Sequence, residues 1–146
     1  MISKKILWGL FLAFVSFDNI FSYLAIVNRG MREFNPIVAF FVSINPIYYF
    51  ISIPLSFSAA YGLIKFSSWL GEKFEKSKAY TRESLERLSL TCLVIGWGIG
   101  VTLFNAVTFV RGFSPLRIDW RIFLVTGAAL AIFYAFFTDY RMKSKK

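Results

Sequence analysis

An aspartate inside an apolar segment is the residue of this sequence with the clearest chemical potential. Asp18 lies within the first apolar segment, which runs from about Ile6 to Val27. A carboxylate near the centre of a membrane helix costs about 2.5–3.5 kcal/mol to insert, so it normally faces a protein interior or a wet cavity. Ser22 follows one helical turn later on the same face. Asn105, in the outer half of the third apolar segment, is the polar residue best placed to meet them.

A second group of polar residues follows in the connection between the first two apolar segments. Gly30 is expected to end the first helix in the left-handed conformation. Glu33 comes two residues before Asn35, which is expected to cap the N-terminus of the second helix. Arg29, Arg32 and Arg111 fall on the same outer side and would neutralise Glu33. The predicted polar cluster therefore joins residues of the first three helices: Asp18, Ser22, Glu33, Asn35, Asn105, Arg29 and Arg111.

Two interpretations of this cluster stay open at the level of sequence. In the first, Asp18 hydrogen-bonds Asn105 and pins the first helix to the third, while Glu33 and Asn35 build the turn. In the second, the cluster is a binding site, because an ionisable residue inside a membrane is a functional hypothesis by default.

The elements that must position these residues follow from composition. Of the 146 residues, 57% are hydrophobic and 17% charged, and the apolar stretches between the charges are each about as long as a bilayer is thick. We predict an all-α integral membrane bundle of four transmembrane helices in a single domain over residues 1–146. The predicted helices cover about 5–28, 36–66, 82–110 and 119–139, with a cytoplasmic loop over about 67–81.

The residue counts also exclude several classes of function. The chain has no histidine and a single cysteine, Cys92, which excludes histidine acid–base catalysis and ordinary zinc sites. No cofactor and no metal are expected, and a nucleic-acid-binding domain is not expected despite the net charge of +9. Most of the 17 lysines and arginines lie in the termini and the middle loop. The positive-inside rule therefore places both termini in the cytoplasm, in a multi-pass protein of the cell membrane.

Prolines and a threonine mark expected features of the second and third helices. Pro46 and Pro54 fall inside the second helix, where each removes one backbone hydrogen bond and is expected to kink it. We expect that helix to run on beyond the membrane for a few turns. Thr81 is expected to cap the start of the third helix.

Small residues indicate how the last two helices pack. Gly96 and Gly100 form a GxxxG pair, which permits close helix–helix approach. We favour packing inside one chain over a dimer seam for this pair. Gly127, Ala131 and Ala135 repeat every four residues and give the fourth helix a small-residue face of its own.

The stretch from Asp18 to Pro36 resembles the signature of an uncharacterised family of small multi-pass prokaryotic membrane proteins, catalogued as a domain of unknown function. The family pattern reads Asp, then Thr, then Gly, then Glu-x-Asn-Pro. The matching residues are Asp18, Gly30, Glu33, Asn35 and Pro36, with Ser22 in place of the usual threonine. The resemblance covers the first helix, the turn and the start of the second helix, and it implies no activity, because none is established for the family.

Three functions remain open from the sequence. The first is a small membrane protein with an accessory or assembly role, whose partners are lipids and either further copies of itself or a larger membrane complex. The alternative is an oligomeric transporter of an ion or small solute that uses Asp18. The least favoured is a membrane enzyme acting on a lipid phosphate, with Asp18 or Glu33 as base or Mg²⁺ ligand, because no known catalytic spacing supports it.

Overall fold

The protein is a multi-pass membrane protein with an all-α bundle, as predicted. A computed structural model describes residues 2–30, 33, 36–74, 81–110 and 120–143, which form helices and contain no strand. Within these residues, 4 helices are long and apolar enough to cross a membrane. They are Lys4–Arg29, Pro46–Phe74, Arg82–Thr108 and Arg121–Asp139.

The first span is a single continuous helix with a local signal at each end. Helix α1 covers Lys4–Arg29, and the Ser3 side chain accepts a hydrogen bond from the Ile6 amide at its start. Gly30 ends it in the left-handed conformation, with a φ of 61°. Only glycine adopts this conformation without a steric cost. The predicted role of Gly30 is therefore confirmed.

The second span differs from the single kinked helix expected over 36–66. Helix α2 covers only Pro36–Ile44, and a 3-10 helix, η1, then covers Pro46–Ile51. Helix α3 follows over Ser52–Phe74, well into the loop expected over 67–81. The chain breaks at Asn45, which is extended and accepts a hydrogen bond from the Ile47 amide through its side chain.

The two prolines therefore act as helix starters. Pro46 is the first residue of η1, where a missing N–H group leaves no bond unmade. Pro54 lies in the first turn of α3, whose N–H groups also have no partner within the helix. Pro46 therefore starts the second span instead of kinking it, which corrects the prediction for Pro46, and Pro54 lies within that span at the change from η1 to α3.

The third span changes helix type halfway along. The Thr81 hydroxyl accepts a hydrogen bond from the Ser84 amide, which confirms the predicted cap. Helix α4 covers Arg82–Trp97, a π-helix, η2, covers Gly98–Leu103, and α5 covers Phe104–Val110. The fourth span is α6, Trp120–Lys143.

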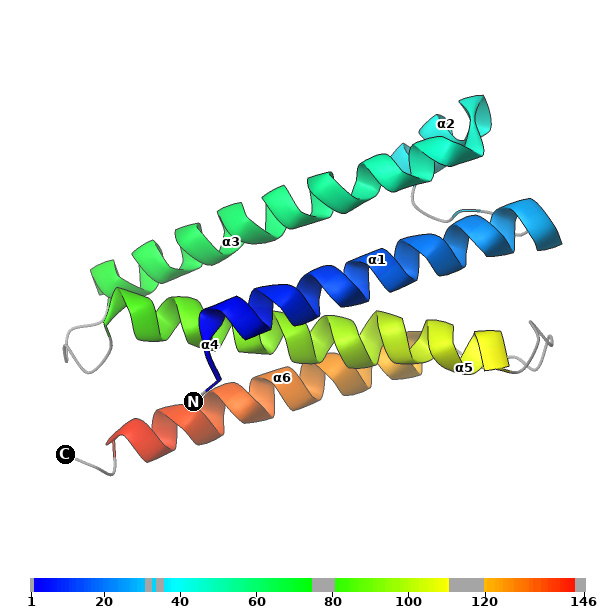
Figure 1. The fold of residues 1–146 in the computed structure, drawn as a ribbon. Coiled ribbons are helices and arrows are strands. Elements are labelled where there is room, and N and C mark those ends of the chain that lie inside the picture. The colour runs from blue at the N-terminus through cyan, green and yellow to red at the C-terminus, as the bar shows by residue number, and fades with distance from the viewer. Residues whose placement is uncertain (1, 31–32, 34–35, 75–80, 111–119, 144–146) are drawn as a thin grey trace.

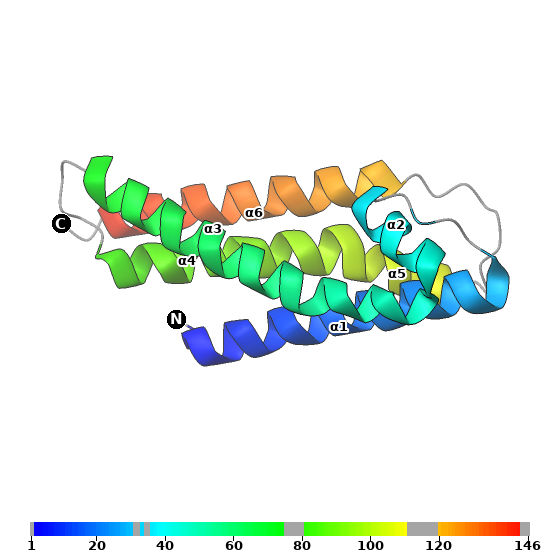
Figure 2. The same cartoon turned by 90° about the horizontal axis from the view of Figure 1, so that it is seen from above.

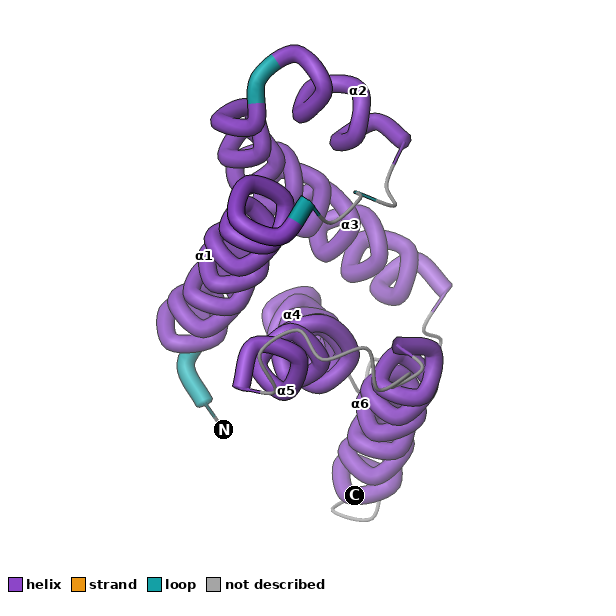
Figure 3. Tube along the Cα trace, turned by 90° about the vertical axis from the view of Figure 1, so that its right-hand side faces the viewer, coloured by secondary structure: helices purple, strands orange, loops and turns teal. Residues whose placement is uncertain are grey.

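Helix α4 is the centre of the bundle. It packs against α1, α3 and α6, and Figure 1 and Figure 2 show α3 crossing the bundle obliquely. A view along the bundle places α4 and α5 in the middle, with α1, α3 and α6 around them (Figure 3). The starts of α1 and α4 lie at one end with the ends of α3 and α6, and we call this the Lys4 end. The opposite end, where α1 finishes, is the Gly30 end (Figure 1).

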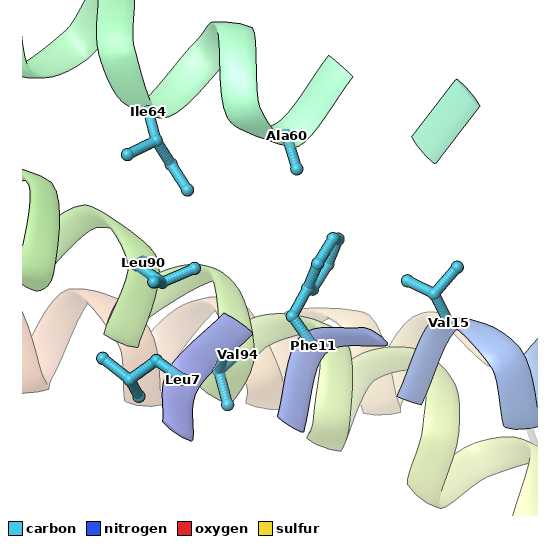
Figure 4. Close-up of a cluster of buried hydrophobic side chains, with 7 residues drawn as sticks. All are labelled: Leu7, Phe11, Val15, Ala60, Ile64, Leu90 and Val94. Atoms are coloured by element: carbon cyan, nitrogen blue, oxygen red, sulfur yellow. The ribbon is translucent and has the colours of Figure 1, made fainter. Parts of the chain in front are cut away.

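The apolar core lies between α1, α3 and α4. Phe11 and Val15 of α1 are fully buried, and Leu90 of α4 is buried beside them. Ala60 and Ile64 point into this cluster from α3 (Figure 4). The core thus fixes the faces that α1 and α4 turn toward one another.

Glycines set the contact between α4 and α6. A Cβ atom at Gly127 would lie 2.8 Å from the carbonyl oxygen of Gly96 and 2.9 Å from the amide nitrogen of Gly100. The GxxxG pair therefore packs against the backbone of α6, which confirms the predicted packing within one chain. One turn along α6 the carbonyl oxygen of Ala131 accepts from the thiol of Cys92, at 3.5 Å.

Candidate functional site

Asp18 is the centre of a buried polar site between α1 and the third span. Asp18 is 5% exposed. Oδ2 accepts hydrogen bonds from the indole N–H of Trp97, at 2.5 Å, and from the hydroxyl of Thr102, at 3.3 Å. Oδ1 accepts from the side-chain amide of Asn105, at 3.3 Å. Three neutral side chains of the third span thus donate hydrogen bonds to one carboxyl group of the first span.

The π-helix explains how three residues at this spacing reach one acceptor. In an α-helix, side chains five positions apart point about 140° away from each other. In a π-helix the hydrogen bonds run from i to i+5, so the residue five positions on returns to the same face. Trp97 and Thr102 stand five apart across η2. The change of helix type therefore brings both donors to Asp18.

Aromatic packing closes the site on the side toward the Lys4 end. The ring of Trp97 meets Phe11 edge to face, with 5.6 Å between ring centroids. A Cβ atom at Gly98 would lie 2.7 Å from the ring of Phe14, one turn before Asp18. Gly98 therefore lets α1 approach the third span closely.

A second polar cluster lies toward the Gly30 end of the bundle. The hydroxyl of Tyr49, in η1, forms hydrogen bonds with the side chains of Ser22 and Glu33. Asn19, which is 5% exposed, contacts the hydroxyl of Ser52 through its amide oxygen and donates from Nδ2 to the carbonyl of Val15, at 2.7 Å. The segment that follows the break at Asn45 thus supplies polar partners to the half of α1 nearest the Gly30 end.

The predicted site residues consequently fall into two neighbouring clusters. Asp18 and Asn105 meet directly, as predicted, whereas Ser22 and Glu33 meet at Tyr49. Arg29 lies in the last turn of α1 at the Gly30 end and is exposed. The remaining two predicted residues, Asn35 and Arg111, lie outside the described residues.

Sequence reasoning missed several residues of these clusters. Trp97 was overlooked because α-helical spacing turns it away from Thr102 and Asn105. Its signal was a tryptophan near the middle of an apolar segment rather than at an end. Tyr49 was overlooked because the sequence predicts one continuous second helix. The structure instead places Tyr49 in the 3-10 helix η1, which packs against α1.

The site consists of one carboxyl group that accepts hydrogen bonds from three neutral side chains. Among the residues that the structure describes, no group of three His, Cys, Asp or Glu side chains is placed to hold a metal ion. Within the described part of the chain, the partners of Asp18 are an indole, a hydroxyl and an amide, and none of them carries a charge. These hydrogen bonds connect the first span to the third, and we call the set formed by Asp18, Trp97, Thr102 and Asn105 the polar lock.

No family model, no curated protein and no solved structure matches the chain. The resemblance of residues 18–36 to a family of small membrane proteins stays a prediction, and it names no activity.

Proposed function

We propose that the protein is a non-enzymatic accessory or assembly component of the cell membrane, in which the Asp18 site locks the first span to the third. The observation that carries the proposal is the set of partners of Asp18. All three described donors come from one span, Trp97 to Asn105, and the acid is 5% exposed.

The energetics of a bilayer favour this interpretation. Lipid tails are as apolar as leucine, so spans associate through close packing and polar contacts rather than through the hydrophobic effect. A hydrogen bond between spans contributes about 0.6 kcal/mol on average and up to about 1.7 kcal/mol, and an orphaned buried donor costs about 1–3 kcal/mol. One acid with three donors therefore fixes both the pairing and the register of α1 on the third span.

The proposed orientation has both termini in the cytoplasm. The Lys4 end carries Lys4, Lys5, Lys65 and Arg82, and cytoplasmic ends of spans are enriched in such residues. A reporter that is active only in the cytoplasm, fused after residue 146, is expected to be active. Activity of a periplasmic reporter at that position would reverse the orientation.

The structural role is tested with two substitutions of the acid. Asp18→Leu removes the acceptor and is expected to lower the thermal stability of the purified protein in detergent. Asp18→Asn retains an amide oxygen for Trp97, while the amide of Asn105 can turn over and accept, so its loss is expected to be smaller. Phe17→Ala, at a 38% exposed neighbour on α1, is the control and is expected to change stability little.

The accessory role is tested in gently solubilised membranes. The wild-type chain is expected to migrate in native gels within an assembly larger than its own 16.8 kDa plus the bound detergent. Asp18→Leu is expected to reduce the amount of that assembly. A chain that migrates alone in every mild detergent contradicts the proposal.

A second candidate function, movement of a proton or cation by an oligomer, is favoured by two observations. A π-helix lies directly beside Asp18, and π-helical turns are frequent at functional sites. Side chains of Asn19, Ser22 and Tyr49 continue the polar contacts from the level of Asp18 to Glu33 at the Gly30 end. In proteoliposomes, flux that is lost in Asp18→Asn while the fold is retained would decide for transport.

A further inference from the structure

A pocket at the Lys4 end of the bundle is independent of the Asp18 site. It has a volume of about 190 Å³ and lies between the starts of α1 and α4 and the middle of α3. Its charged lining consists of Lys4, Lys5, Lys65 and Glu86. Trp8 and Tyr61 provide an aromatic wall, with their ring centroids 6.0 Å apart.

The charges of this pocket do not balance. The side chain of Glu86 is 9% exposed, and its two oxygens accept from Lys4 Nζ at 3.1 Å and from Lys65 Nζ at 2.6 Å. The side chains of these lysines remain 34% and 39% exposed. Lys5 is exposed and has no ion-pair partner among the described residues. Three cations thus face a cavity that contains one carboxylate, and that carboxylate is already paired.

The pocket lies at the boundary between apolar and charged parts of the bundle. Lys4 and Lys5 precede the apolar stretch of α1, and Lys65 is the first charged residue along α3. Arg87, one residue after Glu86, is the last charged residue of α4. A membrane that covers the four apolar spans therefore ends near this level, where lipid phosphates lie.

We propose that this pocket binds the phosphate of an anionic phospholipid headgroup. Charge-assisted hydrogen bonds from lysines to phosphate oxygens are among the strong ones, and basic pockets between membrane helices bind anionic headgroups. The aromatic wall favours a lipid over a free anion as the bound molecule. Tyr61 is 51% exposed beside Trp8, as expected where a ring covers the glycerol and upper acyl region.

Binding is measured on the purified full chain in detergent micelles, with phosphatidylglycerol as the probe and phosphatidylcholine as the neutral-headgroup comparison. Native mass spectrometry counts the retained lipids. The wild-type chain is expected to retain phosphatidylglycerol in preference to phosphatidylcholine. Lys5→Gln is expected to weaken retention of phosphatidylglycerol about fivefold, the usual effect of one basic residue at a membrane surface. Lys5 is chosen because it takes no part in the pairing of Glu86, so the fold is kept.

The matched control is Lys73→Gln, on the exposed end of α3 beyond the pocket, where the ammonium lies 5.3 Å from the ring centroid of Trp69. This variant removes the same charge and is expected to retain phosphatidylglycerol like the wild type. Equal losses in both variants would show diffuse surface attraction and overturn the site. Equal retention of the two lipids by the wild type also overturns it. Displacement of the lipid by inorganic phosphate at equal concentration would assign the pocket to a soluble anion instead.

Discussion

Replacement of Trp97 by phenylalanine isolates the hydrogen bond on which the polar lock depends. Trp97→Phe keeps an aromatic ring against Phe11 and removes the indole N–H that donates to Asp18 at 2.5 Å. A hydrogen bond between membrane spans contributes about 0.6 kcal/mol on average and up to about 1.7 kcal/mol. Because the acceptor here is a carboxyl group, we expect its loss to cost about 1–2 kcal/mol in the free energy of unfolding. The smaller ring also leaves space, and a second variant separates that contribution.

The separation comes from a double-mutant cycle with Asp18→Leu. In that background no carboxyl group remains to accept and the indole N–H of Trp97 is unpaired, so Trp97→Phe loses packing but breaks no hydrogen bond. The difference between the two backgrounds is expected to be about 1–2 kcal/mol, within the range of contacting pairs. Unfolding by dodecyl sulfate in mixed micelles, followed by far-ultraviolet circular dichroism, measures all four proteins. Trp69→Phe, at an exposed tryptophan of α3, is the control and is expected to change stability by about 0.5 kcal/mol or less. A coupling within about 0.3 kcal/mol of zero would refute the lock.

Three further substitutions test other contacts with the same unfolding assay. Gly127→Ala forces a methyl group onto the backbone of the neighbouring helix and is expected to cost about 1–3 kcal/mol, whereas Gly62→Ala meets no atom within 4 Å and is expected to be neutral or stabilising. Glu86→Gln removes the acceptor shared by Lys4, Lys65 and Arg82 and is expected to cost about 1 kcal/mol, because these partners are each about a third or more exposed, while Glu83→Gln, 63% exposed, should cost about 0.5 kcal/mol or less. Thr81→Ala removes the cap of α4 and is expected to cost about 1 kcal/mol, with faster amide exchange in the first turn only.

Features governed by local rules could be predicted from the sequence. The left-handed end of α1 at Gly30 and the cap at Thr81 each depend on a few adjacent residues. The contact between Asp18 and Asn105 was predictable for a different reason. A buried acid needs a partner, and few polar residues stand at the same depth in the other spans.

Features that depend on a change of helix type could not be predicted in the same way. The role of Trp97 follows from a π-helix, and no sequence pattern marks where the i to i+5 bonds begin. The break at Asn45 comes directly before Pro46, the proline for which the sequence predicts a kink inside a continuous helix. An Asn-Pro pair starts a helix as readily as it interrupts one, and only the packing of η1 on α1 decides between the two.

The order of synthesis gives the buried acid one more consequence. Its three donors follow it in the chain by 79, 84 and 87 residues. The first hydrophobic segment therefore leaves the ribosome and enters the insertion machinery long before any partner for its carboxyl group has been translated. Until the third segment arrives, the acid lacks these donors, and its cost of about 2.5–3.5 kcal/mol in the membrane is carried by the apolar residues of the first segment alone. We therefore expect the pairing of the first span with the third to be a late step in the biogenesis of this protein.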